Sequence, residues 1–252
     1  MLSKNRIREL QSLHQKKFRQ KDNLFIAEGR KIVSELVNSS FSVTQLYATS
    51  EFINAQNNSQ LKRIEVVEEL TLEELQKISN LQQAQDALAV CKTPEASEPV
   101  FKADGLYLFL DSIRDPGNLG TLIRLSEWFN LDGIFLSQDC VEWTNPKVIQ
   151  ASMGSFIRMQ PISVGEDFWT SIPKDLSVIS ADLDGDNLYT DSNPPQGILI
   201  ISSESHGLSI DLKEFVNRKI HIPAVKKGAE SLNAAIAASI ILSDFTRRRH
   251  WQ

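Results

Sequence analysis

Short apolar runs in the second half of the chain restrict its fold more than any other feature. They read GLYLFLD, DGIFLS, FIRMQPIS, LSVISAD, GILIIS and KIHIPA, and helical or loop segments separate them. Strands with one face in water alternate apolar and polar residues, whereas these runs are apolar almost throughout. Such strands are typical of a mostly parallel sheet that helices cover on both faces. We therefore expect an α/β domain over residues 101–252.

The segment before residue 100 follows a different pattern. Helical stretches (NRIRELQSLHQKKFRQK, TLEELQKISN) alternate with strand-like runs (VTQLYAT, DALAV), which predicts a small α/β module. It ends in CKTPEASEPVFKADG, where prolines, small residues and charges indicate a linker between residues 92 and 104. The expected domains are therefore residues 1–100 and residues 101–252.

Composition excludes membrane and disulfide-rich classes. The chain is 41% hydrophobic and 23% charged, and it has no apolar run near the roughly 20 residues that span a membrane. Its first residues carry charge without a following apolar stretch, so we expect no signal peptide and a cytoplasmic location. Cys91 and Cys140 stand far apart and outside any CxxC pattern, which favours reduced thiols.

The net charge of −5 hides two basic clusters at the ends of the chain. Residues 1–31 hold nine lysines and arginines against three acidic residues, and RRRH occupies residues 247–250. Either cluster could be a solvated helix surface, but basic patches on an acidic protein also suit salt-sensitive contact with nucleic-acid phosphates. The N-terminal residues expected to make such contacts are Lys4, Arg6, Arg8, Lys16, Lys17, Arg19 and Arg30.

Common cofactor and metal motifs are missing from the sequence. Neither GxGxxG nor GxxxxGK[ST] occurs, so dinucleotide-binding and P-loop functions lose their main support. GxSxG is absent too, which disfavours a serine hydrolase. The four histidines and two cysteines stand at no ligand spacing, and we expect no metal site.

Polar residues gather instead in loops that follow predicted strands, the first of which is DPGNLGTLIR. Leu119, Leu122 and Ile123 share one side of a helix and should face the core, so that Arg124 points away from them. The alternative is that Asn118 simply caps this helix and Arg124 is an ordinary surface residue.

Two further loops have the same placement. SSESHGLS (residues 202–209) follows GILII, although it could be a plain turn in which Gly207 adopts a left-handed conformation. In IPAVKKGAESLN, Ser231 or Glu230 could cap the last helix. Asn233 is expected one turn into an otherwise apolar helix, and a buried amide there demands partners. This last helix is apolar around most of its circumference, so it is buried in a core or shared with a second subunit.

Taken together, the three loops resemble the motifs of the SpoU, or TrmH, family of RNA 2′-O-ribose methyltransferases. The match consists of N-x-G-x-x-x-R, then S-E-x-x-G-L, then I-P followed by S-L-N, in that order. The basic N-terminal module is similar to the RNA-binding extension of the family. The resemblance implies an α/β-knot (SPOUT) domain in which a trefoil knot holds S-adenosylmethionine. It also implies a homodimer that buries the knot region and the last helix.

The resemblance assigns roles residue by residue. The catalytic set that it implies is Asn118, Arg124, Glu204, Ser231 and Asn233. The cofactor-binding set that it implies is Ser202, Ser203, Gly207, Ile222, Pro223, Ser231 and Leu232. The family commonly has glycine at the place of Ser202 and often at that of Ser205. Because serine is small, we expect the cofactor pocket to remain.

The resemblance thus predicts S-adenosylmethionine-dependent 2′-O-methylation of RNA, with ribosomal RNA as the favoured substrate and tRNA as the alternative. A guanidinium stays protonated, so we expect Arg124 to orient a phosphate and stabilise the developing alkoxide rather than act as a base. Two other classes stay open at this point. One is an inactive RNA-binding protein of the same fold, and the other is a small-molecule α/β enzyme.

Overall fold

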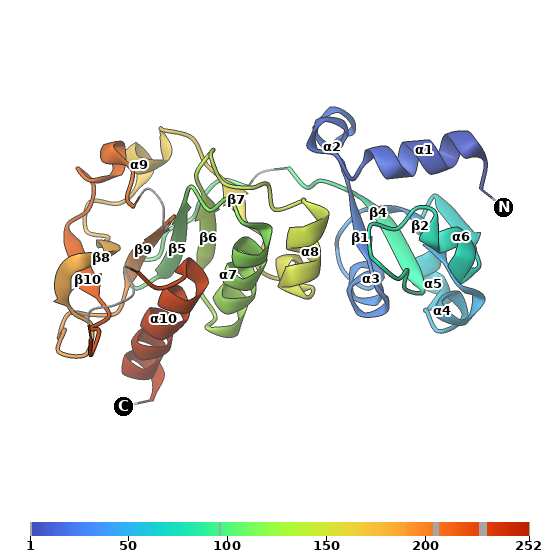
Figure 1. Cartoon of the computed structure of the whole chain (residues 1–252). Helices are drawn as coiled ribbons and strands as arrows, with labels where there is room; N and C mark the ends of the chain where they lie inside the picture. Colours follow the sequence, from blue (N-terminus) through green and yellow to red (C-terminus); the bar gives the residue numbers. More distant parts are fainter. Residues whose placement is uncertain (1, 96, 204–206, 227–230, 252) are drawn as a thin grey trace. The chain divides into compact units, whose positions relative to one another are not determined.

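A computed structural model describes residues 2–95, 97–203, 207–226 and 231–251 (Figure 1). The chain forms two compact units, Met1–Glu95 with Glu142–Ile157 and Ala96–Val141 with Arg158–Gln252. The first change of unit lies close to the boundary expected near residue 100. The second was not expected, because residues 142–157 cluster with the N-terminal part. Within the described ranges, no helix is long and apolar enough to cross a membrane.

The first unit is built on a four-stranded mixed sheet in the order β1-β4-β2-β3. Its strands are β1 (Leu24–Glu28), β2 (Val43–Ala48), β3 (Val66–Glu69) and β4 (Ala87–Lys92). Its helices before residue 95 are α1 (Lys4–Ser12), α2 (Lys16–Asp22), α3 (Arg30–Val37), α4 (Ser50–Asn54), α5 (Asn58–Leu61) and α6 (Leu72–Gln76). The long N-terminal helix that the sequence suggested is thus two helices. The basic segment 1–31 also contains strand β1, whose residues are mostly buried.

The segment Glu142–Ile157 completes the core of this unit. It contains α8 (Pro146–Ser152) and a 3-10 turn, η1 (Ser155–Ile157). Trp143 and Phe156 pack edge-on against Phe25 of β1, with ring centroids 5.4 and 6.1 Å away. Gln150 Nε2 donates a hydrogen bond of 2.7 Å to the carbonyl oxygen of Glu28. Aromatic burial, which contributes much of the energy of a core, therefore ties a chain-distant segment to the first unit.

The second unit has a six-stranded sheet in the order β10-β8-β9-β5-β6-β7, and all its pairs are parallel. The strands are β5 (Leu106–Asp111), β6 (Gly133–Leu136), β7 (Ile162–Ser163), β8 (Val178–Asn187), β9 (Gly197–Ser202) and β10 (Arg218–His221). Its helices are α7 (Pro116–Trp128), α9 (Phe168–Ser171) and α10 (Ala234–His250), with a 3-10 turn, η2 (Ile210–Leu212). The predicted parallel sheet is confirmed. In FIRMQPIS only Ile162–Ser163 form a strand.

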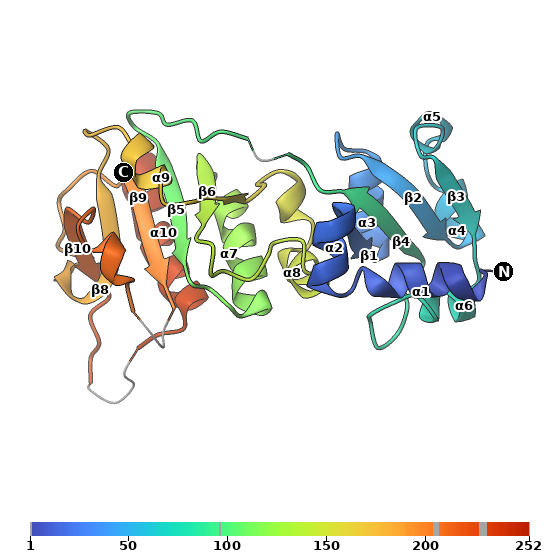
Figure 2. The ribbon, with the colours of Figure 1, turned by 90° about the horizontal axis from the view of Figure 1, so that it is seen from above.

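Helices and aromatic side chains cover this sheet as the apolar runs predict. Helices α7 and α10 pack against each other (Figures 1 and 2). Helix α7 also packs against β6, and α10 packs against β9. Among the buried residues packed together in this unit are Tyr107 and Phe109 of β5 with Phe168 and Trp169 of α9. A sheet buried on both faces needs strands that are apolar at successive positions, and residues 106–110 of β5 are apolar and buried without interruption.

The order of the strands reverses at β5. From β5 the chain adds β6 and β7 on one side, and it then crosses to build β8, β9 and β10 on the other. Strand β9 returns to pair with β5, which places Ser202 beside Asp111 at the carboxyl ends of both strands. In open parallel sheets, ligands bind outside the carboxyl ends at such a switch point.

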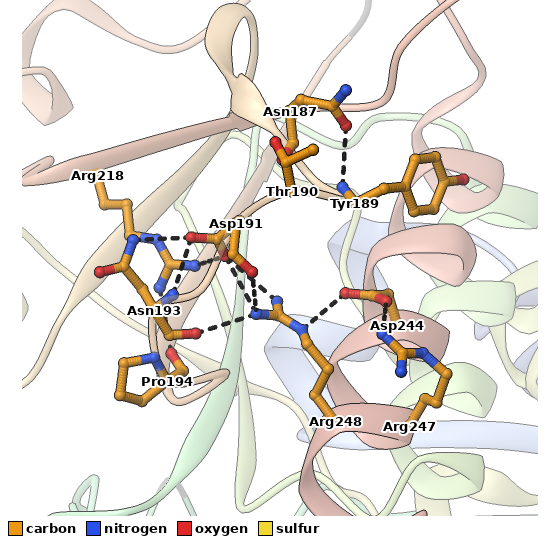
Figure 3. Close-up of polar contacts among 10 residues, drawn as sticks. All are labelled: Asn187, Tyr189, Thr190, Asp191, Asn193, Pro194, Arg218, Asp244, Arg247 and Arg248. Carbon is orange, nitrogen blue, oxygen red and sulfur yellow. Dashed lines mark hydrogen bonds and ion pairs between the residues drawn. The ribbon is translucent and has the colours of Figure 1, made fainter. Parts of the chain in front are cut away.

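The C-terminal RRRH cluster is largely occupied within this unit (Figure 3). The carboxylate of Asp191, with 1% of its side chain exposed, pairs with Arg218 and Arg248. Arg248 Nη1 also donates to the carbonyl oxygens of Asp191 and Asn193, at 3.0 Å each. Arg249 Nη1 donates to the carbonyl oxygen of Asp104 at 2.9 Å. These arginines fasten the end of α10 to neighbouring loops.

The same network reaches one turn back along α10. Asp244 is buried and makes ion pairs with Arg248 Nε and Arg247 Nη2, both at 2.8 Å. The guanidinium of Arg248 also lies 5.0 Å from the ring centroid of Phe245. Of the three arginines, only Arg247 is mostly exposed. The cluster is therefore a structural element more than a phosphate-binding patch.

We expect replacement of Asp191 by alanine to destabilise the protein in a pH-dependent way. Burial raises the pKa of Asp191, but hydrogen bonds from Asn193 and the charges of Arg218 and Arg248 outweigh it, so the pKa lies below its ordinary value. A carboxylate with a lowered pKa stabilises the fold above its unfolded pKa of about 3.9, and this stabilisation is lost as the pH falls through the folded pKa. Removing one partner of a buried pair costs about 3–5 kcal/mol.

Urea unfolding at pH 7 and at pH 3 measures both effects. Asp191→Ala should lower the free energy of unfolding by about 3 kcal/mol at pH 7. The difference in free energy of unfolding between this variant and the wild type should become smaller toward pH 3. Asp175→Ala, at an exposed position of the same unit, serves as the control. Equal unfolding midpoints for Asp191→Ala and wild type at pH 7 would show that the network does not stabilise the fold.

Candidate functional site

A cavity of about 260 Å³ lies beside the carboxyl ends of β9 and β10. Its walls come from the middle of β8, the ends of β9 and β10, described residues of the loops that follow β9 and β10, and the first turns of α10. Leu183, Ile201, Leu208, Ile222 and Leu232 supply apolar surface there. Mostly apolar walls with a few polar groups are typical of a small-molecule site, although the volume is slightly below the usual range of about 300–1,000 Å³.

The residues expected to bind the cofactor converge on this cavity. Those that line it are Ser202, Ser203, Gly207, Ile222, Ser231 and Leu232. The seventh, Pro223, is half-buried beside Ile222 but is not part of the lining. Ser202 stands where the family commonly has glycine, and a cavity is present with the serine in place. Gly207 has a φ of +63°, a left-handed conformation that glycine adopts at little cost.

Asn233 connects the start of α10 with the α7 loop. It is the N-cap of α10, because its Oδ1 accepts hydrogen bonds from the amides of Ala235 at 3.0 Å and Ile236 at 3.3 Å. Its Nδ2 donates to Asn118 Oδ1 at 3.0 Å. The side-chain amide thus has partners on both sides, but Asn233 is half-buried and stands just before the helix, not one turn into it as expected. The alternative that Ser231 or Glu230 caps this helix is wrong, since Asn233 occupies the cap position.

Helix α7 is capped by Asp115 rather than by Asn118. Asp115 Oδ1 accepts a hydrogen bond of 2.7 Å from the amide of Asn118, and Pro116 follows as the first helical residue. A proline suits this position because its missing N–H would have no partner there. The interpretation of Asn118 as a simple helix cap is therefore wrong. Its side chain is used instead for the contact with Asn233.

Arg124 projects from the solvent side of α7. Leu119, Leu122 and Ile123 are buried as predicted, and Arg124 is exposed on the opposite side of the helix. The part of the chain that the structure describes gives Arg124 no hydrogen-bond or ion-pair partner. Its guanidinium can therefore bind an anion from outside the protein. Glu204, the remaining member of the expected catalytic set, lies outside the described residues.

Two polar residues near the cavity were missed by the sequence analysis. Asp111 is buried at the end of β5 and accepts hydrogen bonds from the amide and hydroxyl of Ser209, at 2.9 and 2.8 Å. His221 lines the cavity, and its Nδ1 lies 2.6 Å from the carbonyl oxygen of Gly185. Each is the last residue of its strand, β5 for Asp111 and β10 for His221, and a polar residue at the end of a predicted strand was the available signal.

The basic residues of the first unit divide into exposed and occupied groups. Those on α1 and α2 that are exposed are Lys4, Arg8, Lys16, Lys17 and Lys21. Arg6 is bound to Glu9 and to the hydroxyl of Tyr47, and Arg30 pairs with Glu51 and Asp86. Arg19 differs most from the expectation. It is 3% exposed and pairs with Glu142 while donating to the carbonyl oxygen of Leu13, so it cannot reach RNA.

Neither metal nor thiol chemistry is indicated in the described part of the chain. That part contains no group of three or more histidine, cysteine, aspartate or glutamate side chains able to hold a metal. Cys91 and Cys140 are both buried free thiols, and burial raises the pKa of each. A thiol of raised pKa is a poor nucleophile at neutral pH.

Comparison with known families decides how this arrangement is to be interpreted. The profile of the SpoU rRNA Methylase family matches residues 105–243, which is more than half of the chain. The chain belongs to the SpoU rRNA methylase family. Residues 4–89 of this SpoU-family chain also match an MRM3-like substrate binding domain. The two matches correspond to the two groups of residues described above, the site in the second unit and the basic helices of the first.

Individual relatives resemble the chain over nearly its whole length. A solved structure from Porphyromonas gingivalis, described as an RNA methyltransferase of the TrmH family, is 34% identical with a TM-score of 0.89, over 98% of this chain and 99% of that one. The 23S rRNA (guanosine(2553)-2′-O)-methyltransferase RlmP of Bacillus subtilis is 26% identical over 94% of both chains. An AdoMet-bound rRNA methyltransferase from Sinorhizobium meliloti shares the fold, with 24% identity, a TM-score of 0.87, and coverage of 100% and 97%.

The contact between Asn118 and Asn233 can be separated experimentally from the helix cap. Asn233→Ser keeps a cap oxygen but is too short to reach Asn118, so we expect stability within about 0.5 kcal/mol of wild type and reduced methyl transfer. Asn233→Ala removes both functions and should cost about 1 kcal/mol of stability as well. Chemical unfolding and activity assays on both variants test this. Full activity of Asn233→Ser would show that the bridge to Asn118 is dispensable.

Proposed function

We propose that this chain transfers a methyl group from S-adenosylmethionine to the 2′-hydroxyl of a nucleotide in ribosomal RNA. The observation that carries the proposal is the convergence of three chain-distant loops on one switch point. Ser202 and Ser203 after β9, and Ile222, Ser231 and Leu232 after β10, line the cavity. Asn233 joins the last of these loops to Asn118 in the first turn of α7, and the expected catalytic arginine projects from the same helix. Family membership indicates which reaction these loops serve.

The residues around the cavity fit the chemistry of S-adenosylmethionine. Apolar side chains such as Leu183 and Leu208 can hold the adenine ring, and the hydroxyls of Ser202, Ser203 and Ser231 can bind its polar groups. His221 and Asp182 add further polar surface. The bound cofactor would supply a methyl carbon activated by its sulfonium. The chain itself has to align the ribose oxygen with that carbon and keep the two in contact.

In the proposed reaction, the ribose oxygen forms a bond to the methyl carbon while the bond from carbon to sulfur breaks, and the hydroxyl loses its proton. The developing negative charge on the ribose oxygen needs a nearby donor. Arg124 is exposed and has no partner within the described residues. Its planar guanidinium can bind a backbone phosphate with two parallel hydrogen bonds and stabilise the alkoxide. Because a guanidinium stays protonated, the proton leaves toward the phosphate or water.

Recognition of RNA is assigned to the exposed basic residues of α1 and α2. Lys4, Arg8, Lys16 and Lys17 present positive charge that phosphates can neutralise with release of counterions. The favoured substrate is ribosomal RNA because the relatives that match nearly the full length of the chain include the 23S rRNA methyltransferase RlmP. If the protein methylated tRNA and not ribosomal RNA, the proposed substrate would be wrong.

A homodimer, a trefoil knot in the second unit and a cytoplasmic location complete the proposal. Support for a dimer comes from exposed apolar side chains on two helices that pack together, with Ile236 of α10 51% exposed and Trp128 of α7 79% exposed. Exposed apolar side chains of this kind suit a subunit interface. Light scattering tests the dimer, because the monomer has a mass of 28.4 kDa.

The role of Arg124 predicts a specific kinetic change. Arg124→Lys keeps the charge but loses the two parallel donors, so we expect kcat to fall about a hundredfold, as when one preorganised donor is removed. The KM for S-adenosylmethionine should stay nearly unchanged. Transfer of radiolabelled methyl groups to ribosomal RNA measures both quantities, with Arg247→Lys as the control at another mostly exposed arginine. A wild-type rate for Arg124→Lys would contradict the proposed role.

The RNA contacts predict a change in salt dependence. The double substitution Lys16→Gln and Lys17→Gln should weaken RNA binding and flatten the plot of log Kd against log salt by about 0.7–0.9 per lost phosphate contact. Lys62→Gln with Arg63→Gln, at exposed positions of the same unit, is the matched control. Filter binding at several salt concentrations measures the slope. Identical slopes for the two double variants would remove α2 from the RNA-binding surface.

A further inference from the structure

Asp111 closes the loop that follows β9, although no motif contains it. Its backbone oxygen accepts a hydrogen bond of 3.0 Å from the amide of Ser203, where the loop begins. Its carboxylate accepts hydrogen bonds from Ser209, where the loop ends, at 2.9 Å from the amide and 2.8 Å from the hydroxyl. Both ends of the segment 203–209 are therefore fixed by a single residue.

The carboxylate is buried, which makes these hydrogen bonds strong and their loss costly. Asp111 is 2% exposed, and Ser112 Oγ is a further donor to it at 3.3 Å. Hydrogen bonds to a charged acceptor contribute about 1.5–3 kcal/mol each, more than neutral ones. Removal of the carboxylate would leave the Ser209 end of the loop without this anchor.

The backbone beside Asp111 is held in a conformation that needs support. Ser112 has a φ of +56°, which lies in the left-handed region that residues with a side chain rarely adopt. Its amide donates to Ser137 Oγ at 2.9 Å. Strained residues persist where the surroundings fix them, and they cluster at functional sites. The turn after β5 is therefore built to hold Asp111 in one position.

The residues directly before Ser209 form part of the cavity wall. Gly207 and Leu208 both line the cavity, as does Ser203 at the other end of the loop. The amide of Gly207 donates to the carbonyl oxygen of Ser203 at 3.0 Å. A shift of Ser209 would therefore move the wall at Gly207 and Leu208. Asp111 touches the loop and is not itself part of the lining.

We propose that Asp111 is a positioning residue for cofactor binding, which acts by holding Ser209 and with it the cavity wall at Gly207 and Leu208. The inference rests on the proposed function, in which this cavity binds S-adenosylmethionine. It assigns to Asp111 an effect on cofactor affinity and no part in the methyl transfer itself.

Asp132 offers a matched control in the same unit. Its carboxylate accepts a hydrogen bond of 3.0 Å from the amide of Leu106, at the amino end of β5, and pairs with Lys102 Nζ at 2.6 Å. Asp132 thus anchors backbone at the opposite end of the strand on which Asp111 lies. Asp132→Ala removes a more exposed carboxylate that also anchors backbone and lies outside the cavity lining, so it reports loss of stability alone.

The test measures the Kd of S-adenosylhomocysteine by calorimetry, together with kcat and the KM for S-adenosylmethionine. Asp111→Ala should raise Kd and KM about tenfold or more, since one lost charged hydrogen bond is worth that much. Its kcat at saturating cofactor and its RNA affinity should stay within about threefold of wild type. Asp132→Ala should lower the melting temperature and leave the Kd within about twofold. Asp111→Asn keeps one acceptor for the Ser209 amide and should recover part of the affinity.

Each outcome decides between the proposals. Wild-type affinity in Asp111→Ala, or an equal loss in Asp132→Ala, overturns the positioning role and leaves the proposed function standing. Absence of cofactor binding by the wild-type protein overturns the proposed function itself and this inference with it. If Asp111→Ala does not fold, the Kd of S-adenosylhomocysteine is measured for Ser209→Ala instead. This substitution should raise the Kd about tenfold by loss of one hydrogen bond to the charged carboxylate, and an unchanged Kd in both Ser209→Ala and Asp111→Asn overturns the role.

Discussion

The parallel pairing of β5 with β9 is the constraint on which the site depends. It brings Asp111 beside Ser202 although 90 residues of chain separate them, and it places the reversal of strand order at this pair. From that point the loop after β9 turns into the cavity, and β10 and α10 close the other side. The polar groups of the site are therefore supplied by loops, and rigid buried strands hold those loops in place.

Positive charge has several distinct roles in this chain, and burial distinguishes them. Arg19 and Arg248 are committed to internal carboxylates, since a buried guanidinium without a partner would be costly. Lys16 and Lys17 remain exposed and can attract RNA. Arg124 is also exposed, but it lies on α7, whose first turn contains Asn118. Net charge gives no indication of this division, because it averages over all three roles.

Much of the second unit could be predicted from sequence because its signals are local. Continuous apolar runs predicted the parallel sheet, and polar residues after strands predicted loops that meet at one edge. The partners of individual polar residues could not be predicted in the same way. Asp115 competes with Asn118 for the cap of α7, and only the folded geometry shows that Asn118 contacts Asn233. The assignment of residues 142–157 to the first unit depends on aromatic contacts with Phe25, which no local pattern encodes.

The central claim is that the cavity at the switch point, together with Arg124, methylates a ribose in ribosomal RNA. The most direct measurement is a map of 2′-O-methylation across ribosomal RNA from cells that lack this chain, beside cells that express either the wild-type chain or Arg124→Ala. The account predicts that one ribose position loses its methyl group, that the wild-type chain restores it, and that Arg124→Ala does not. Unchanged ribosomal RNA methylation, or full restoration by Arg124→Ala, would contradict it.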